Sequence, residues 1–142
     1  MLGPSAHVDT FSRDNLPPQD QWPEFATGGF DYPDLLNVGV ILTDEMVAKG
    51  FGDHTALIGN GRRRTYKEMS DWTNRLAHVL VEDLGVKPGN RVLIRSANNP
   101  AMVACWLAAT KVGAVVVNTM PMLRAGELRA IVDKAQISHA LC

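Results

Sequence analysis

Residues of chemically active types occur along this chain, but their spacing favours structural roles. Three consecutive arginines at 62–64 could meet a phosphate, yet they lie in a short predicted strand, where charges usually serve solubility. Cys105 stands beside Trp106 in an apolar helical run, which is typical of a packed thiol. Four histidines lack both metal-ligand spacing and an evident nucleophile partner: His7, His54 (in Asp53-His54-Thr55), His78 and His139. We therefore assign no catalytic residue and no metal ligand.

Two short polar segments follow predicted strands and are the best-placed candidates for a pocket. They are Ser96–Asn99 and Asn118–Met120. Open α/β sheets bind ligands at the loops that follow the carboxyl ends of their parallel strands. Helix capping by Asn99 and ordinary loop chemistry also account for most of this composition. The sequence leaves open whether these loops line a pocket, so we assign no cofactor-binding or substrate-binding residue.

The composition bounds the class of protein. The chain has 142 residues and a net charge of −1, so it shows no concentrated basic face of the kind that nucleic-acid binding requires. Its opening lacks the pattern of a secretory signal, and no stretch holds about 18 uninterrupted apolar residues. The two cysteines, Cys105 and Cys142, form no disulfide framework. We expect a soluble cytoplasmic protein that binds neither nucleic acid nor membrane.

Residues 1–35 differ in composition from the rest and predict an extended, proline-rich arm. Prolines oppose a continuous helix because they fix one backbone angle and lack an N–H donor. Aromatic residues are spread between the polar ones, and we expect their rings to be buried across a globular surface. The prolines are Pro4, Pro17, Pro18, Pro23 and Pro33, and the aromatic residues are Phe11, Trp22, Phe25, Phe30 and Tyr32.

Residues 36–142 predict alternating helices and strands. Apolar residues at helical spacing indicate a helix over 37–49 that ends at Gly50. Asn60-Gly61 between short extended runs predicts a β-hairpin over 56–65. Thr65 and Glu68 form a capping box, which begins a helix that reaches Gly85. The remaining elements are a strand at 91–95, a helix from Asn99-Pro100 to Gly113, and then strand 114–117, helix 125–134 and strand 139–142.

This order predicts an α/β fold. Strands separated by helices pair in parallel through right-handed crossovers, and a parallel sheet needs helices on both faces. The predicted domain is therefore a mostly parallel sheet flanked by helices, with one small β-hairpin. The apolar strand at 139–142 has no covering helix after it, so we expect the natural polypeptide to continue beyond Cys142.

Residues from about Asp53 to Cys142 carry an ordered series of motifs. The series consists of TYKE at 65–68, GVKPGNRV at 85–92 and KVGAVVV at 111–117, with Pro121 after it. It resembles the first part of the adenylate-forming (AMP-binding) superfamily, which contains acyl-CoA and aryl-CoA ligases, peptide-synthetase adenylation domains and luciferases. The segments Asn118–Pro121 and Leu123–Ala125, together with the opening arm, are similar to benzoate and above all 2-aminobenzoate (anthranilate) CoA ligases.

The resemblance implies the N-terminal part of an AMP-forming acid–thiol ligase. Such an enzyme joins an aryl carboxylic acid to CoA through an acyl adenylate, uses ATP, releases AMP and pyrophosphate, and is assisted by Mg²⁺. The family's phosphate loop with its lysine, its adenine-contacting aromatic motif, its ribose-binding aspartate and its C-terminal lysine all fall later in full-length members. We therefore expect this fragment to be inactive and to bind no ATP, Mg²⁺ or CoA by itself.

Two other functional hypotheses stay open. One is a free-standing α/β nucleotide-binding module, although the segment after the 91–95 strand is SANN and not a glycine-rich phosphate turn. The other is a non-catalytic interaction domain that docks through its aromatic arm. The sequence determines neither the ring substituents of the acid nor the oligomeric state, and a homo-oligomer is compatible with it.

Overall fold

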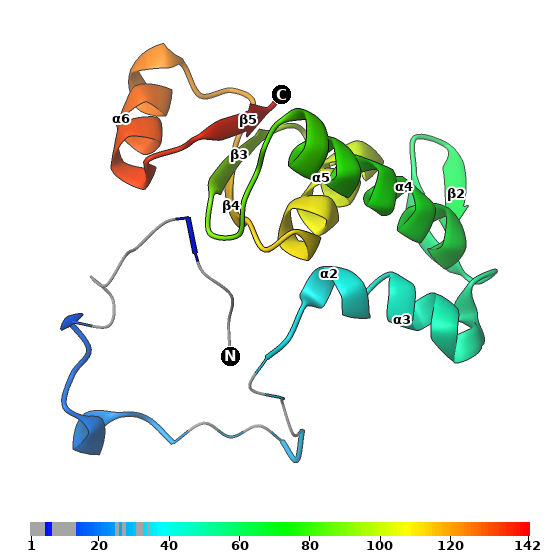
Figure 1. Cartoon of the computed structure of the whole chain (residues 1–142), viewed down its shortest axis with the longest axis horizontal. Helices are drawn as coiled ribbons and strands as arrows, with labels where there is room; N and C mark the ends of the chain where they lie inside the picture. Colours follow the sequence, from blue (N-terminus) through cyan, green and yellow to red (C-terminus); the bar gives the residue numbers. More distant parts are fainter. Residues whose placement is uncertain (1–4, 7–13, 25, 27, 31–32, 34) are drawn as a thin grey trace.

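The computed structural model describes residues 5–6, 14–24, 26, 28–30, 33 and 35–142. Helical elements and strands alternate from residue 55 onward, as the sequence predicted (Figure 1). The elements are η1 (Gln19–Gln21), α2 (Val38–Ile41), α3 (Asp44–Met46), η2 (Val47–Phe51), β1 (Thr55–Gly59), β2 (Arg62–Thr65), α4 (Tyr66–His78), η3 (Val79–Asp83), β3 (Arg91–Arg95), α5 (Pro100–Lys111), β4 (Val115–Thr119), α6 (Ala125–Ala135) and β5 (His139–Leu141).

The main sheet has three parallel strands in the order β4-β3-β5. In the β3–β4 pair, Arg91 is level with Val115 and Arg95 is level with Thr119. Each connection between successive strands contains a helix, because parallel strands cannot be joined by a tight turn. The predicted α/β fold with a mostly parallel sheet and one small hairpin is thus confirmed.

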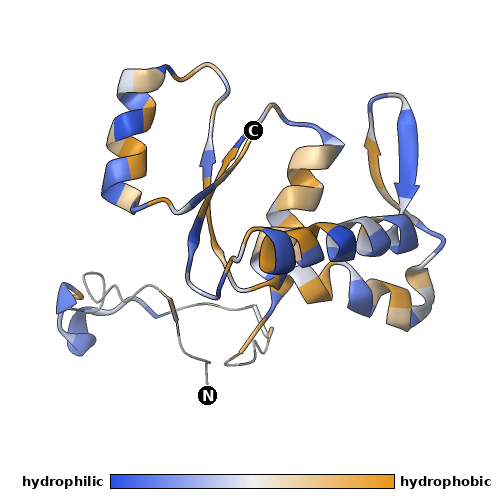
Figure 2. Cartoon of the chain, turned by 45° about the horizontal axis from the view of Figure 1, so that its top comes forward, coloured by the Kyte–Doolittle hydropathy of each residue, from blue (hydrophilic) through white to orange (hydrophobic). Residues whose placement is uncertain are grey.

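Helices lie on both faces of this sheet. Figures 1 and 2 place α5 on one face, with α4 packed on the side of α5 that is away from the sheet, and α6 on the other face. Side chains alternate between the faces along each strand, so Val92 and Ile94 point to the α5 face and Leu93 to the α6 face. All three are buried. The central strand β3 is therefore apolar on both faces, as expected of a strand covered by helices on each side.

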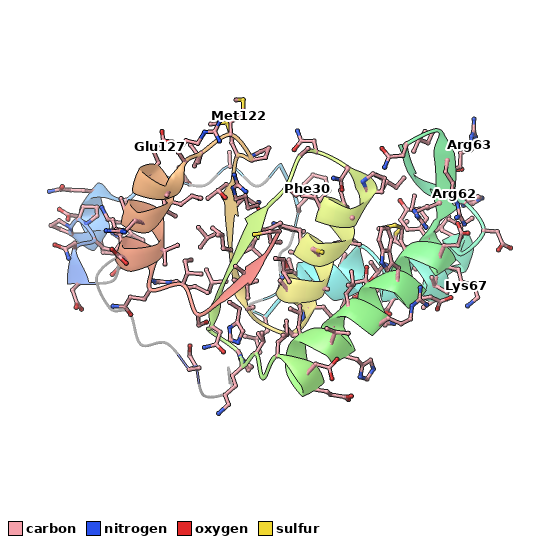
Figure 3. The ribbon with its side chains drawn as sticks, turned by 90° about the horizontal axis from the view of Figure 1, so that it is seen from above. Phe30, Arg62, Arg63, Lys67, Met122 and Glu127 are labelled. Carbon is pink, nitrogen blue, oxygen red and sulfur yellow. The ribbon has the colours of Figure 1, made fainter. Side chains whose placement is uncertain are left out.

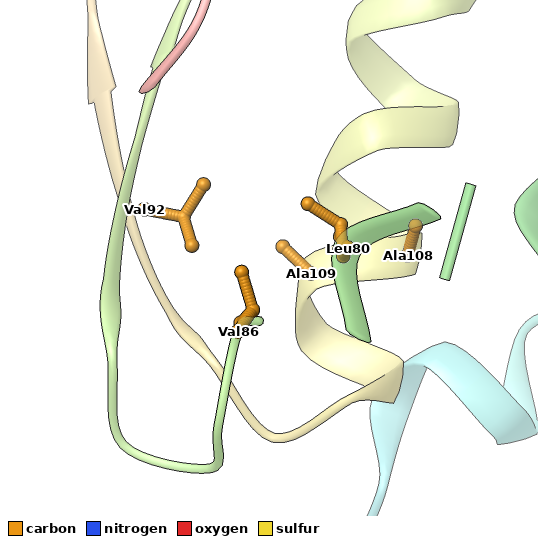
Figure 4. Close-up of a cluster of buried hydrophobic side chains, with 5 residues drawn as sticks. All are labelled: Leu80, Val86, Val92, Ala108 and Ala109. Carbon is orange, nitrogen blue, oxygen red and sulfur yellow. The ribbon is translucent and has the colours of Figure 1, made fainter. Parts of the chain in front are cut away.

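The core lies between the sheet and the helix pair α4–α5. Five buried residues from four segments meet there: Leu80, Val86, Val92, Ala108 and Ala109 (Figure 4). The alanines of α5 let that helix approach the strands closely. A second cluster, built on Met69, Ala104 and Leu107, joins α4 to the other side of α5 and reaches the hairpin. Helix α5 contributes to both clusters, which explains why it is apolar nearly all round.

The hairpin forms as its turn residues predicted. Asn60 and Gly61 both have positive φ, 53° and 71°, which a two-residue type I′ turn requires. Gly59 lies against the start of α5, since a Cβ atom built there would be 2.7 Å from Pro100 Cγ. On the other side of the hairpin, the Arg64 guanidinium lies 4.4 Å from the centre of the Trp72 ring. The hairpin is thus fastened to both α5 and α4.

The capping box at the start of α4 is present. Thr65 Oγ1 accepts from the Glu68 N–H at 3.1 Å, and Glu68 Oε2 accepts from the Thr65 N–H at 2.9 Å. The hydrogen bond from Thr65 N–H and then that from Arg62 lower the pKa of Glu68. After His78 the helix continues as the π turn η3, and Gly85 (φ 66°) ends it. This local motif explains why the helix begins where the sequence predicted.

The single helix predicted over 37–49 is wrong, because the structure divides it into α2, α3 and η2. The break is at Thr43, whose backbone angles (φ −126°, ψ −79°) are not helical. Its buried hydroxyl donates back to the Gly39 carbonyl at 2.5 Å. Asp44 then begins α3, and its side chain joins a polar network with Ser70 of α4 and Lys111 of α5. Gly50, the predicted end, does adopt a left-handed conformation (φ 89°).

The aromatic arm differs from the prediction where it is described. Trp22 is 46% exposed and Phe30 is 70% exposed, so neither ring is buried on a globular surface. The Trp22 indole instead donates locally to the Pro17 carbonyl at 2.8 Å. Phe11, Phe25 and Tyr32 lie outside the described residues. The division of the chain into an arm at 1–35 and a domain at 36–142 stays a prediction.

Candidate functional site

Two loops at the carboxyl ends of β3 and β4 lie side by side. Because the two strands are parallel and in register, the segments at 96–99 and 118–121 emerge at the same edge of the sheet. Together with one residue of α5 they line a surface pocket of about 310 Å³. Its lining residues are Ser96, Ala97, Asn98, Met102, Asn118, Thr119, Met120 and Pro121. We call it the strand-end pocket. The structure therefore brings together both loops that the sequence singled out.

A second pocket adjoins the first across the start of α5. It has a volume of about 390 Å³ and lies between the hairpin turn and the first turn of α5. Asn98 and Met102 line both pockets. The hairpin wall, which includes Ile58 and Asn60, could not be predicted from the sequence, because nothing local indicates that the hairpin packs on α5. The two pockets therefore lie next to each other between the hairpin and the end of β4.

The start of α5 has its hydrogen bonds satisfied by its own cap. Asn99 Oδ1 accepts from the Met102 N–H at 2.9 Å, and Asn99 Nδ2 donates to Ser96 Oγ at 3.2 Å. The next residue, Pro100, has no N–H to offer. Phosphate loops differ, because they present several free backbone N–H groups to the anion. This arrangement explains the polar residues at 96–99 by helix capping, as the sequence reading proposed.

Arginines at the two ends of β3 hold the segment that contains α6. Arg95 Nη2 donates to the Pro121 carbonyl at 2.5 Å and to the Leu123 carbonyl at 3.2 Å, in the loop before α6. Arg91 Nη1 donates to the carbonyl of Ala135, the last residue of α6, at 2.9 Å. Neither role was predicted from the sequence. The pattern RVLIR could have indicated them, because it places two charged residues on one face of an otherwise apolar strand.

A polar network joins α3, α4 and α5, and it was not predicted from the sequence. Lys111 Nζ lies 2.6 Å from Asp44 Oδ2 and donates to Asn74 Oδ1 at 2.7 Å. Ser70 Oγ donates to Asp44 Oδ1 at 2.8 Å. Burial raises the pKa of Asp44, but the hydrogen bonds from Lys111, Ser70 and Asn74 together outweigh it and lower the pKa. The network joins helices and leaves Lys111 10% exposed, which fits a structural role.

The three-arginine run at 62–64 is largely engaged with its own surroundings. Arg62 pairs with Glu68 at 3.0 Å, and Arg64 covers Trp72. Arg63 is exposed on the hairpin, and Figure 3 shows its side chain pointing away from the body of the molecule. These positions support the solubility role inferred from the sequence.

The histidines are dispersed over the structure, and each described one has a local contact. His54 stacks near Phe51 with ring centres 5.3 Å apart, and His78 pairs with Glu82 at 3.0 Å. His139 Nε2 lies 2.9 Å from the Leu84 carbonyl, while His7 is outside the described part. Among the described side chains, no group of three His, Cys, Asp or Glu residues could hold a metal ion.

Cys105 and the helices of the described ranges offer no further site. Burial raises the pKa of the Cys105 thiol, which disfavours the reactive thiolate form. None of the helices in the described ranges is both long and apolar enough to cross a membrane. The candidate site is therefore the strand-end pocket and its neighbour, which contain loop amides, hydroxyls and methionines.

Comparison with known proteins gives consistent sequence matches. The family described as AMP-binding enzyme matches residues 45–142. A crotonobetaine/carnitine–CoA ligase of Salmonella paratyphi A is 33% identical over 97 residues, covering 65% of this chain and 19% of that protein. A 3-oxocholest-4-en-26-oate–CoA ligase of Rhodococcus rhodochrous is 35% identical over 85 residues, covering 60% and 15%. The chain thus spans less than a fifth of the length of these curated relatives.

Solved structures give the same fold. The N-terminal subdomain of NpsA from Klebsiella oxytoca superimposes with a TM-score of 0.67 at 28% identity, covering 75% of this chain and 27% of that one. The same subdomain in complex with 3-hydroxyanthranilyl-AMSN matches equally well. The anthranilate CoA ligase AuaEII, in complex with anthranoyl-AMP, has a TM-score of 0.69 at 23% identity, covering 78% and 21%. The match to an N-terminal subdomain agrees with the predicted fold.

Proposed function

Because the chain belongs to the AMP-binding enzyme family, we propose that it is the N-terminal segment of an AMP-forming acid–CoA ligase that acts on an aryl acid. The observation that carries the proposal is the family match over residues 45–142, together with two relatives that are both named as CoA ligases. In the proposed reaction the carboxylate attacks the α-phosphate of ATP, which gives an acyl adenylate and pyrophosphate. The CoA thiol then displaces AMP and forms the thioester.

We propose that the catalytic groups for these steps belong to the part of the enzyme that lies outside this 142-residue segment. The strand-end pocket is lined by neutral side chains, so it offers no cation for a triphosphate. Mg²⁺ would screen phosphate charge in the first step. The described residues do not fit a Mg²⁺ site, because their carboxylates form no cluster. The proposed role of this segment is to build the scaffold and part of the binding surface.

The aryl specificity has two supports. Residues 118–121 and 123–125 are similar to those of benzoate and 2-aminobenzoate ligases. NpsA, a structural neighbour at 28% identity, has been crystallised with 3-hydroxyanthranilyl-AMSN, which carries an aminobenzoate group. A second candidate, a ligase for a non-aromatic acid, is favoured by the two curated relatives, which are named for carnitine-type and sterol-derived acids.

Acid-dependent exchange of pyrophosphate into ATP tests the proposal. The complete protein encoded by the gene should catalyse exchange with benzoate or 2-aminobenzoate. Crotonobetaine and a medium-chain fatty acid serve as competitors in the same assay, and preference for either would select the second candidate. The 142-residue chain alone is the matched control and should show no exchange above background.

Two outcomes would contradict the proposal. Robust exchange by the 142-residue chain would mean that the active site lies within these residues. A stop codon directly after Cys142, combined with a lack of exchange, would instead favour the nucleotide-binding module or the interaction domain. Sedimentation of the complete protein would measure its oligomeric state. The sequence is compatible with a homo-oligomer.

A further inference from the structure

We propose that Arg95 is a positioning residue, which holds the loop after β4 in the shape that the strand-end pocket needs to bind an uncharged portion of a substrate. This inference rests on the ligase function proposed above. It concerns a residue that does not itself line the pocket. Arg95 acts through the loop at 120–123, whose first two residues form one wall of the pocket.

The geometry of the Arg95 side chain suits this role. One guanidinium nitrogen reaches the carbonyls of Pro121 and Leu123, which lie on either side of Met122. Met122 is highly exposed and points outward, as Figure 3 shows, so its own side chain does little to hold the loop. Both bonds from Arg95 are charge-assisted; the one to the Leu123 carbonyl is partly shielded from water, and the one to the Pro121 carbonyl is exposed. The loop has one internal backbone hydrogen bond, from the Leu123 N–H to the Met120 carbonyl at 3.3 Å, and Arg95 ties it to β3.

Two buried polar atoms beside this loop have no hydrogen-bond partner among the described residues. They are Arg95 Nε and Thr119 Oγ1. The strand register places these two residues level with each other on β3 and β4, and on the same face of the sheet. A buried donor without a partner costs free energy, so such pairs mark places where a further acceptor is expected.

The lining of the pocket indicates the chemistry of its occupant. Its accessible polar groups are the hydroxyl of Ser96 and the amides of Asn98 and Asn118, while two methionines and a proline supply apolar surface; the Thr119 hydroxyl is buried. Amides and hydroxyls bind neutral polar groups, and methionine adapts to irregular apolar shapes. Of the proposed substrates, the triphosphate of ATP is excluded. The aryl part of the acid and the uncharged arm of CoA remain, and they share this neutral, partly apolar chemistry.

The test uses steady-state kinetics of the complete protein with Arg95→Met and Arg95→Lys. In Arg95→Met the KM for either the acid or CoA should rise roughly tenfold, because a displaced wall weakens binding of the group that contacts it. The KM for ATP should stay within about twofold, since the pocket has no cation for the triphosphate. Whichever KM rises identifies the occupant. Arg95→Lys should restore binding in part, because an ammonium cannot hold two carbonyls as a planar guanidinium does.

Arg91→Met is the matched control. Arg91 lies on the same face of the same strand and also donates to a backbone carbonyl, but at the far end of α6. The Arg91→Met variant should have a lower melting temperature than wild type and an unchanged KM for the acid, CoA and ATP. Equal KM changes in the Arg91 and Arg95 variants would show a merely structural role and overturn the inference, as would a change confined to the KM for ATP.

Amide hydrogen exchange separates this inference from the proposed function. If the complete wild-type protein lacks acid-dependent exchange of pyrophosphate, the ligase proposal fails. Arg95 can still be tested, because Arg95→Met should speed amide exchange at 120–124 and leave that at 134–137 near the wild-type rate. Equal protection of residues 120–124 in Arg95→Met and wild type would overturn the positioning role in either case.

Discussion

Thr43 and Thr73 are both fully buried, but they differ in how their hydroxyl groups are bonded. Thr43 Oγ1 donates to the Gly39 carbonyl, whereas Thr73 Oγ1 has no partner among the described residues. Removing a satisfied buried hydroxyl loses a hydrogen bond, while removing an unsatisfied one relieves a desolvation cost. The two positions therefore respond in opposite ways to the same change.

We predict that Thr43→Val lowers the free energy of unfolding by about 1–2 kcal/mol and that Thr73→Val raises it by up to about 1 kcal/mol. Valine keeps the shape of threonine in both cases, so the hydroxyl is the main difference. Urea unfolding, with midpoints compared at equal slope, measures both values. Destabilisation of similar size at both positions would mean that Thr73 has a partner after all.

Asp44 makes stability depend on pH at the acid end. Its pKa is lowered in the folded state because the hydrogen bonds from Lys111, Ser70 and Asn74 outweigh the effect of burial. A carboxyl with a lowered folded pKa stabilises the fold above its unfolded pKa, and this contribution is lost as pH falls from about 4 toward the folded value. Above that range the contribution is complete.

The Asp44→Asn variant should be less stable than wild type at pH 7 by about 1–2 kcal/mol, because it removes the carboxylate partner of the largely buried Lys111, an effect reduced by solvent screening of Asp44, which is 39% exposed. The difference between the two proteins should shrink as the pH falls below about 4, where Asp44 becomes protonated in the unfolded state while the lowered pKa keeps it ionised in the folded state. Urea unfolding at pH 7, 5, 4 and 3 follows this difference. A gap that is constant across the whole range would argue against an ionised Asp44.

At the scale of elements, the approach of α2 to α5 depends on one glycine. A Cβ atom at Gly39 would lie 2.7 Å from the Leu107 carbonyl oxygen and 2.9 Å from the Lys111 nitrogen, both in the backbone of α5. Backbone atoms cannot rotate away, so the helices would have to separate. Asn37 strengthens the same contact, since its side chain accepts from the Val40 N–H and donates to the Lys111 carbonyl.

Gly39→Ala should therefore destabilise the protein by about 1–3 kcal/mol through overpacking. Gly126→Ala is the matched control in helix α6, because a Cβ atom there meets nothing within 4 Å. That substitution should stabilise by about 0.5–1 kcal/mol, since alanine loses less backbone entropy in a helix. Thermal unfolding followed by circular dichroism measures both. The same sign at both positions would contradict the close packing of α2 on α5.

At the scale of the whole molecule, part of the sheet is uncovered. The outer edges of β4 and β5 have no strand partner within the described chain, and Val115 on β4 is 48% exposed. Helix α6 has no fully buried residue, so it covers its face of the sheet less tightly than α5 covers the other. Exposed strand edges and apolar surface of this kind favour contacts with further polypeptide.

If the chain is the N-terminal segment of a longer ligase, the exposed sheet edges and apolar surface should be covered in the complete protein. We predict that the 142-residue chain binds the dye 1-anilinonaphthalene-8-sulfonate and that its sheet melts at a lower temperature than in the complete protein. Calorimetry and dye fluorescence measure this difference. Equal melting temperatures and no dye binding would show that the sheet is already covered by these residues.

Elements whose signals lie within a few residues were predictable from the sequence. The turn at Asn60-Gly61, the capping box of Thr65 and Glu68, and the Asn99-Pro100 helix start all formed as expected, because each depends on backbone geometry and hydrogen bonds between near neighbours. The parallel sheet followed from the alternation of strands and helices. The same rule placed the loops at 96–99 and 118–120 at one edge, although whether they line a pocket stayed open.

Features that join distant parts of the chain were decided by the tertiary structure. Arg95 and Pro121 are 26 residues apart, and nothing near either residue indicates that they meet. The predicted helix at 37–49 breaks at Thr43, and the side chain of the next residue, Asp44, has partners on α4 and α5 of which local periodicity carries no trace. The sequence by itself determined the elements and their order, since these arise from short-range interactions. Tertiary packing decided the polar network, the hydrogen bonds from Arg95 to the loop at 120–123, and the pocket. Each of these requires side chains from separate elements to lie next to one another.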